Sequence, residues 1–149
     1  MRALLAATCV LLLTVINPAS AQEPACTPVR VMAFEVASGG EVIEAAAAEL
    51  AASLVRRAAD DSLVCWVPVG AQRRAQDPSD RPVSPRYALM GGLVALGGDS
   101  VLVDWRLQRL GSGELVVSGK ARVATVDLRD VPDRITESVV EAISKLPPS

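Results

Sequence analysis

Histidine is missing from this 149-residue chain. It is the commonest general base at neutral pH, the usual partner of a serine or cysteine nucleophile and the commonest metal ligand. Its absence argues against a triad-type hydrolase and against a histidine-based metal centre. Aromatic residues are also few, at 3% of the chain. Trp105 falls in phase with the apolar positions of its strand, so we expect burial there and no stacking platform for bases or sugars.

The chain has no basic excess, and its only long apolar run lies near its first residue. A formal net charge of −2 provides nothing to recruit nucleic acid or an anionic membrane. Residues 1–21 have the pattern of a secretory signal, because Arg2 is their only charge, Ala3–Ile16 is apolar and small residues precede Gln22. The apolar run is shorter than the roughly 20 residues of a membrane span. We expect cleavage between Ala21 and Gln22, a periplasmic mature protein with no membrane span, and one domain over 22–149; an uncleaved anchor is the alternative.

Cysteine is scarce, with three residues in the chain. Cys9 would leave with the signal, and Cys26 and Cys65 would remain as an even pair. Their spacing fits neither a CxxC redox motif nor a zinc cluster. In an oxidising compartment we favour a Cys26–Cys65 disulfide over two free thiols.

The stretch from Tyr87 to Val123 predicts an antiparallel meander. Three runs with period-two patterning are separated by glycine turns at Gly97-Gly98-Asp99 and Gly111-Ser112-Gly113. In the second run the apolar side chains alternate with Asp104, Arg106 and Gln108. One face of this sheet is therefore expected to be core and the other exposed to water.

A strand, a helix and a second strand are predicted before the meander. Val29–Glu35 and Leu63–Val69 are mostly apolar, as expected for strands covered on both faces. Between them, a helix from Glu41 to about Ala59 has an apolar stripe on one side. Such a unit is parallel by default and would bring Cys26 close to Cys65.

A proline-rich connector and a second helix complete the pattern. The connector, Gly70–Arg86, is cationic, and its arginines are candidate partner-binding residues: Arg73, Arg74, Arg81 and Arg86. A plain solvated connector is the alternative. Asp130 or Val131 is expected to cap the second helix, with Pro132 in its first turn. The apolar stripe of this helix comprises Ile135, Val139, Ala142, Ile143 and Leu146.

One stretch suggests an anion site. Ser38, Gly39 and Gly40 lie between the first strand and the helix, where backbone amides could hold a small anion. A simple turn with a capping box from Ser38 to Glu41 is the competing interpretation. Ser118 and Lys120 share a strand face, but their charged surroundings favour a solvated cross-strand patch over a catalytic dyad.

The whole order of elements resembles the TolB amino-terminal-like family, which includes FlgO-type and CsgG/LpoB-type envelope domains. The resemblance rests on VRVMAFE, LVCWVPV, the Tyr87–Gly92 stretch YALMGG and the turn at Gly97–Ser100 before VLVDWRL. The chain departs from the family at Gly70–Arg86, where a proline-rich loop replaces a helix, and no propeller follows. The resemblance implies an open α/β sheet, interaction with other envelope components and no catalytic residues.

We therefore expect a mixed α/β sheet with two helices on one face. The favoured function is a non-enzymatic interaction or assembly module of the envelope, acting through the arginine connector or a free sheet edge, with no cofactor and no metal. Binding of a small anion near Ser38–Glu41 is the alternative, and a hydrolase is the least favoured class.

Overall fold

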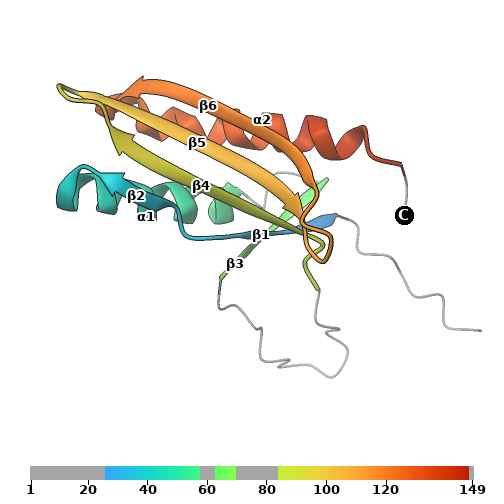
Figure 1. The fold of residues 1–149 in the computed structure, drawn as a ribbon. Helices are drawn as coiled ribbons and strands as arrows, with labels where there is room; N and C mark the ends of the chain where they lie inside the picture. The colour runs from blue at the N-terminus through green and yellow to red at the C-terminus, as the bar shows by residue number, and fades with distance from the viewer. Residues whose placement is uncertain (1–25, 58–62, 70–83, 148–149) are drawn as a thin grey trace, which may run out of the picture.

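The computed structural model describes residues 26–57, 63–69 and 84–147, and the structural statements below refer to these residues. The elements follow one another as β1 Thr27–Val31, β2 Glu35–Ser38, α1 Gly40–Arg57, β3 Val64–Pro68, β4 Tyr87–Ala95, β5 Ser100–Arg109, β6 Leu115–Ala124, the 3₁₀ helix η1 Thr125–Asp130 and α2 Val131–Ser144. They form one sheet with both helices on the same face (Figure 1). The predicted α/β class and layer arrangement are confirmed.

The sheet joins a parallel half to an antiparallel half at β4. Its order is β3-β1-β4-β5-β6, and β2 pairs with β4 farther along the same edge that β1 occupies. The β1–β3, β1–β4 and β2–β4 pairs are parallel, whereas β4–β5 and β5–β6 are antiparallel. The predicted meander is thus confirmed, and so is the parallel pairing of the first strand with the one after α1.

The first predicted strand is interrupted, which corrects the continuous strand expected over Val29–Glu35. It forms β1 and β2, separated by residues 32–34. Strict alternation from Val29 and Val31 would send Glu35 to the core, since a strand repeats every two residues. The interruption shifts the phase, so Phe34 is buried and Glu35 is exposed. Burying an aromatic ring and leaving a carboxylate in water explains why the break is favoured.

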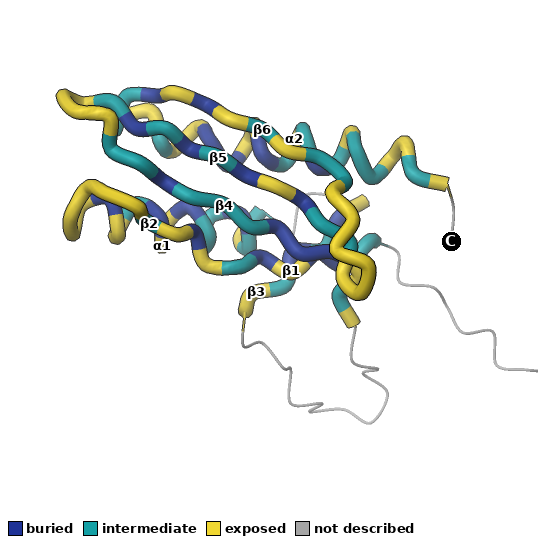
Figure 2. Tube along the Cα trace, viewed as in Figure 1, coloured by how far each residue is buried: buried dark blue, intermediate teal, exposed yellow. Residues whose placement is uncertain are grey.

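The meander has the predicted division between its two faces. Burial alternates residue by residue along β5, with Val101, Val103, Trp105 and Leu107 buried (Figure 2). The expected burial of Trp105 is confirmed. The facing side chains of α1 and α2 complete this core, including Leu54 and Ile135, which are fully buried.

A row of alternating aromatic and glycine residues crosses the core face of the sheet. Gly91 of β4 is opposite Trp105 of β5, which is opposite Gly119 of β6. Phe34 lies over Gly91, and the Trp105 indole lies over Gly119, so closely that a Cβ at either glycine would overlap the ring. Because glycine has no side chain, both rings pack directly against the backbone of the neighbouring strand. These contacts keep the interrupted first strand and β5 in one packing layer.

The predicted disulfide is confirmed. Cys26 and Cys65 are bonded, with their Cα atoms 5.6 Å apart and 39 positions apart in the sequence. The bond joins the segment before β1 to β3 and so crosslinks the two shortest neighbouring strands of the parallel half. In the helix layer, an ion pair between Arg57 and Asp133 joins α1 to α2.

The helix ends differ from the predicted capping. Ser38 does not cap α1; its hydroxyl donates to the carbonyl oxygen of Ala95 at 3.4 Å. The pairing of β2 with β4 brings Ala95 within reach, so a tertiary partner replaces the local one. For α2, Asp130 occupies the N-cap position without a side-chain cap bond, and Pro132 lies in the first turn as predicted. The segment before it forms η1, which the sequence analysis did not predict.

Candidate interaction site

The arginine connector lies almost entirely outside the described residues. Arg73, Arg74 and Arg81 fall in 70–83, so their role stays a prediction. Arg86 is described: its side chain is exposed, its amide donates to the Pro28 carbonyl at 3.1 Å and its carbonyl accepts from Leu110 at 2.8 Å. Its backbone is thus fixed at the start of β4, and its guanidinium is available to solvent.

The predicted Ser38–Gly40 turn lies where β2 meets α1: Ser38 ends the strand, Gly39 lies between the two elements and Gly40 begins the helix. Gly39 and Gly40 have φ angles of 136° and 65°. These angles favour glycine strongly, and a side chain at Gly39 would also overlap Ile43. The turn therefore has a structural reason for both glycines. Whether it binds an anion stays a prediction.

The side of β2 away from β4 is a free sheet edge within the described part of the chain. We call the position of the next strand along this edge of the sheet the lane. Beside β1 the lane is occupied by β3, whose last paired residue, Pro68, is opposite Val31. Farther along, β2 pairs with β4 alone. The backbone groups on the outer side of β2 are thus available to another strand.

An apolar groove lies between residues 31–36 and α1, and Val36 is the β2 residue that lines it. One hollow of about 370 Å³ is lined by Ala33, Phe34, Val36, Glu44, Ala47, Ala48 and Ala51. An adjoining hollow of about 480 Å³ shares Ala33 and Ala51 and continues to Val55, Arg56, Pro68 and Val69. Because α1 presents mostly alanine here, the space between strand and helix is left unfilled. We call the two hollows together the β2–α1 groove.

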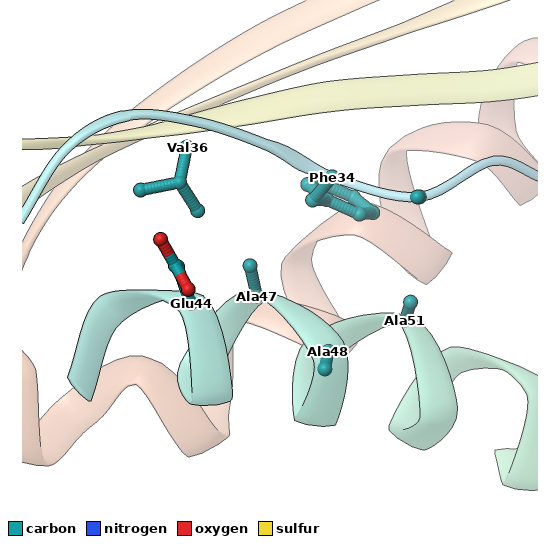
Figure 3. Close-up of a pocket in the computed structure, with 7 residues that line it drawn as sticks. Phe34, Val36, Glu44, Ala47, Ala48 and Ala51 are labelled. Atoms are coloured by element: carbon teal, nitrogen blue, oxygen red, sulfur yellow. The ribbon is translucent and has the colours of Figure 1, made fainter. Parts of the chain in front are cut away.

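Glu44 is the free charge of the groove. In the close-up, its carboxylate points from α1 toward Val36 of β2 (Figure 3). Among the described residues it has no ion-pair partner. Arg56, at the other end, is already engaged: its guanidinium donates to Glu49 and, at 2.8 Å, to Ser53. The hydrogen bond from Arg56 lowers the pKa of Glu49. The groove therefore has an uncompensated negative charge at its Val36 end.

The open face of the sheet is polar and charged, as predicted. Lys120 lies opposite Asp104, and Ser118 lies opposite Arg106. Ser118, Lys120 and Arg106 are exposed, so the lysine lacks the desolvation that a catalytic base requires. The cross-strand charge patch is confirmed. The described residues hold no group of three or more histidine, cysteine, aspartate or glutamate side chains that could bind a metal ion.

Solved structures of similar shape show which known fold this chain adopts. TolB from Acinetobacter baumannii superimposes with a TM-score of 0.53 at 7% identity, covering 83% of this chain and 29% of TolB. The fold is TolB-like. The hypothetical protein CT253 from Chlamydia trachomatis matches with the same TM-score and 7% identity, over 80% of this chain and 99% of CT253. The LpoB C-terminal domain from Escherichia coli reaches 0.48 at 19% identity, over 66% of this chain and 82% of that one.

The likenesses to TolB and to CT253 confirm, at the level of fold, the resemblance seen in the sequence. No protein-family model matches the chain, and no curated protein is significantly similar to it in sequence. Since this chain spans only 29% of TolB, the partners of that whole protein do not transfer with the fold. None of the helices in the described ranges is long and apolar enough to cross a membrane.

Sequence reasoning named a free sheet edge but missed the groove beside it. The strand predicted over Val29–Glu35 includes Phe34 and ends before Val36, and the pattern does not reveal the phase shift that turns both side chains toward α1. The available signal was the alanine-rich stretch of α1, because small side chains facing a short strand leave unfilled space. Glu44 gave no separate signal, since exposed carboxylates are common on helices.

Proposed function

We propose that the mature protein is a non-enzymatic protein-interaction module of the bacterial cell envelope, located in the periplasm. The signal-like pattern of residues 1–21 and the Cys26–Cys65 disulfide support export to an oxidising compartment. The TolB-like fold supports an α/β domain without supplying a partner.

The observation that carries this proposal is the free edge of β2 beside the β2–α1 groove. A free edge offers unpaired backbone groups, and a neighbouring apolar groove offers area from which a partner can exclude water. This combination occurs in domains that bind an extended segment of another protein. The arginine connector is a second candidate surface, supported by its charge and by the exposed side chain of Arg86.

Site-specific photo-crosslinking in living cells tests the proposal. A photoreactive residue at the position of Ala37, which is exposed on β2, is compared with one at Ser118 on the open face of the sheet. We expect a discrete adduct with an envelope protein from Ala37 and none from Ser118. Equal labelling from both positions, or none from Ala37, would contradict a specific β2 surface.

The connector is tested in the same cells. A variant with alanine at Arg73, Arg74, Arg81 and Arg86 should lose the Ala37 adduct if these arginines help to hold the partner. An undiminished adduct would make the connector a plain linker. The small-anion alternative at Ser38, Gly39 and Gly40 stays a prediction, to be tested by a saturable thermal shift with single anionic metabolites.

A further inference from the structure

The lane beside β2 has the dimensions of one added strand. β3 fills this lane next to β1, where its buried side chains Val64 and Trp66 occupy the space between sheet and helix. Next to β2, the described residues place no strand in the lane, and the β2–α1 groove opens in its stead. With four residues, the β2 edge is about 13 Å long at 3.3 Å per residue.

We propose that this lane binds an extended segment of a partner protein as an added β-strand, with apolar residues at alternate positions and a basic residue near Glu44. This inference rests on the proposed function and specifies its partner chemistry. Alternate side chains of a strand point to one face, so every second residue would enter the groove toward α1. The alanines there leave room for valine-sized side chains.

The charges of the groove select the sign of the partner. Glu44 points toward Val36 and has no ion-pair partner among the described residues. Glu35, at the start of β2 and outside the groove lining, is exposed and adds a second negative charge at this end of the strand. Arg56 is the one cation that lines the described groove, and Glu49 and Ser53 engage its guanidinium. A cationic side chain is therefore favoured at the Val36 end, and an acidic one is disfavoured.

Fluorescence anisotropy with the full mature protein tests this directly. The probe is a short fluorescein-labelled peptide of alternating valine and threonine with lysine at both ends, and its counterpart has glutamate at both ends. We expect the lysine peptide to bind and the glutamate peptide to bind roughly tenfold more weakly. A third peptide, N-methylated on alternate amides, keeps the side chains and loses strand hydrogen bonds, so it should not bind.

Four variants of the protein, two tests and two matched controls, locate the site. Glu44→Lys should weaken binding of the lysine peptide about tenfold and favour the glutamate peptide. The control Glu137→Lys changes an exposed carboxylate of α2 that has no ion-pair partner in the described part of the chain, and it should alter binding of neither peptide. Ala48→Phe fills the groove from an exposed position and should abolish binding, while Ala45→Phe, exposed on the same helix outside the groove lining, should not.

Three outcomes would overturn the inference. One is equal binding of the lysine, glutamate and N-methylated peptides. Another is self-association in sedimentation that Ala48→Phe abolishes, which would make a second copy the occupant. The third is no peptide binding at all. If the Ala37 adduct forms in cells while no peptide binds, the strand-addition inference fails and the proposed function stands; if the adduct is also missing, both fail.

Discussion

The antiparallel half of the sheet, β4 to β6, and the parallel half, β1 to β3, are stabilised by different interactions. The antiparallel half has strands of nine and ten residues that pair along most of their length, with one register shift between Leu107 and Gln108. The indole of Trp105 in this half packs directly on Gly119 of the neighbouring strand. The parallel half has strands of four and five residues, an interruption at 32–34, a disulfide and an unfilled groove. Packing holds the first half, whereas a covalent bond replaces part of that packing in the second. Because the second half is not filled, it is the half that can accept a partner.

The largest expected effect is loss of the disulfide. Replacing Cys26 and Cys65 with alanine should lower the free energy of unfolding by about 4 kcal/mol, since the bond restricts a loop of roughly 40 residues in the unfolded chain. Urea denaturation measures the change. If the comparison between the halves is right, hydrogen exchange in the variant should accelerate most in β1 and β3. Uniform acceleration across the sheet would contradict it.

The next effect concerns the row of rings and glycines. Gly91→Ala should destabilise the protein by about 3 kcal/mol, because the added methyl group overlaps Phe34 and the Asp104 carbonyl. Gly92→Ala is the matched control on the other face, where the nearest atom would be 3.4 Å away. It should change stability by less than about 1 kcal/mol. Equal costs at both positions would mean that the row does not hold the core face together.

The two halves of the sheet should also differ in their amide hydrogen-exchange rates in the unmodified protein. Amides of β5, which pairs on both sides within the meander, should exchange slowest, at rates close to those set by global unfolding. Amides of β2 should exchange fastest among the strands, because it is short and pairs on one side only. Hydrogen–deuterium exchange with mass spectrometry measures both in one experiment. Slower exchange in β2 than in β5 would reverse the assignment.

The smallest effect concerns exposed ion pairs on the two helices that cover the sheet. The hydrogen bonds from Arg56 and Lys145 lower the pKa values of Glu49 and Glu141 from their ordinary value of 4.5. A depressed pKa stabilises the fold above the unfolded-state value, and this stability is lost as the pH falls through the lowered pKa.

The thermal unfolding midpoint shows this small effect as a function of pH. Glu49→Gln should therefore lower the midpoint slightly at pH 7 and not at all once the carboxylate is protonated in both states. High salt should reduce the difference, since the pair is solvent-exposed. Glu44→Gln, which removes a carboxylate without an ion-pair partner among the described residues, is the control for the substitution itself. The same midpoint shift at every pH would contradict the linkage.

Sequence patterns predicted the fold well where local signals and tertiary contacts agree. Glycine turns and period-two runs define the meander, and the stripes of α1 and α2 define the helix layer. The prediction was wrong where a distant contact prevails over a local preference. Ser38 binds Ala95 and leaves the cap of α1, and burial of Phe34 shifts the phase of the first strand.

The candidate site was less predictable for the same reason. Its groove depends on β3 having its last paired residue at Pro68 while β2 continues along β4, a relation between strands that are far apart in the sequence. No single residue encodes it. The cysteine pair, by contrast, could be predicted from compartment and spacing, because a disulfide needs only that two thiols meet.

The measurement that tests the account most directly is hydrogen–deuterium exchange of the mature protein with and without the lysine-ended peptide. We predict that the peptide slows exchange in β2 and in the groove-lining turns of α1 and leaves β5 and β6 unchanged. Slower exchange over β5 and β6, or no difference anywhere, would contradict the conclusion that the parallel half binds the partner and the antiparallel half holds the fold.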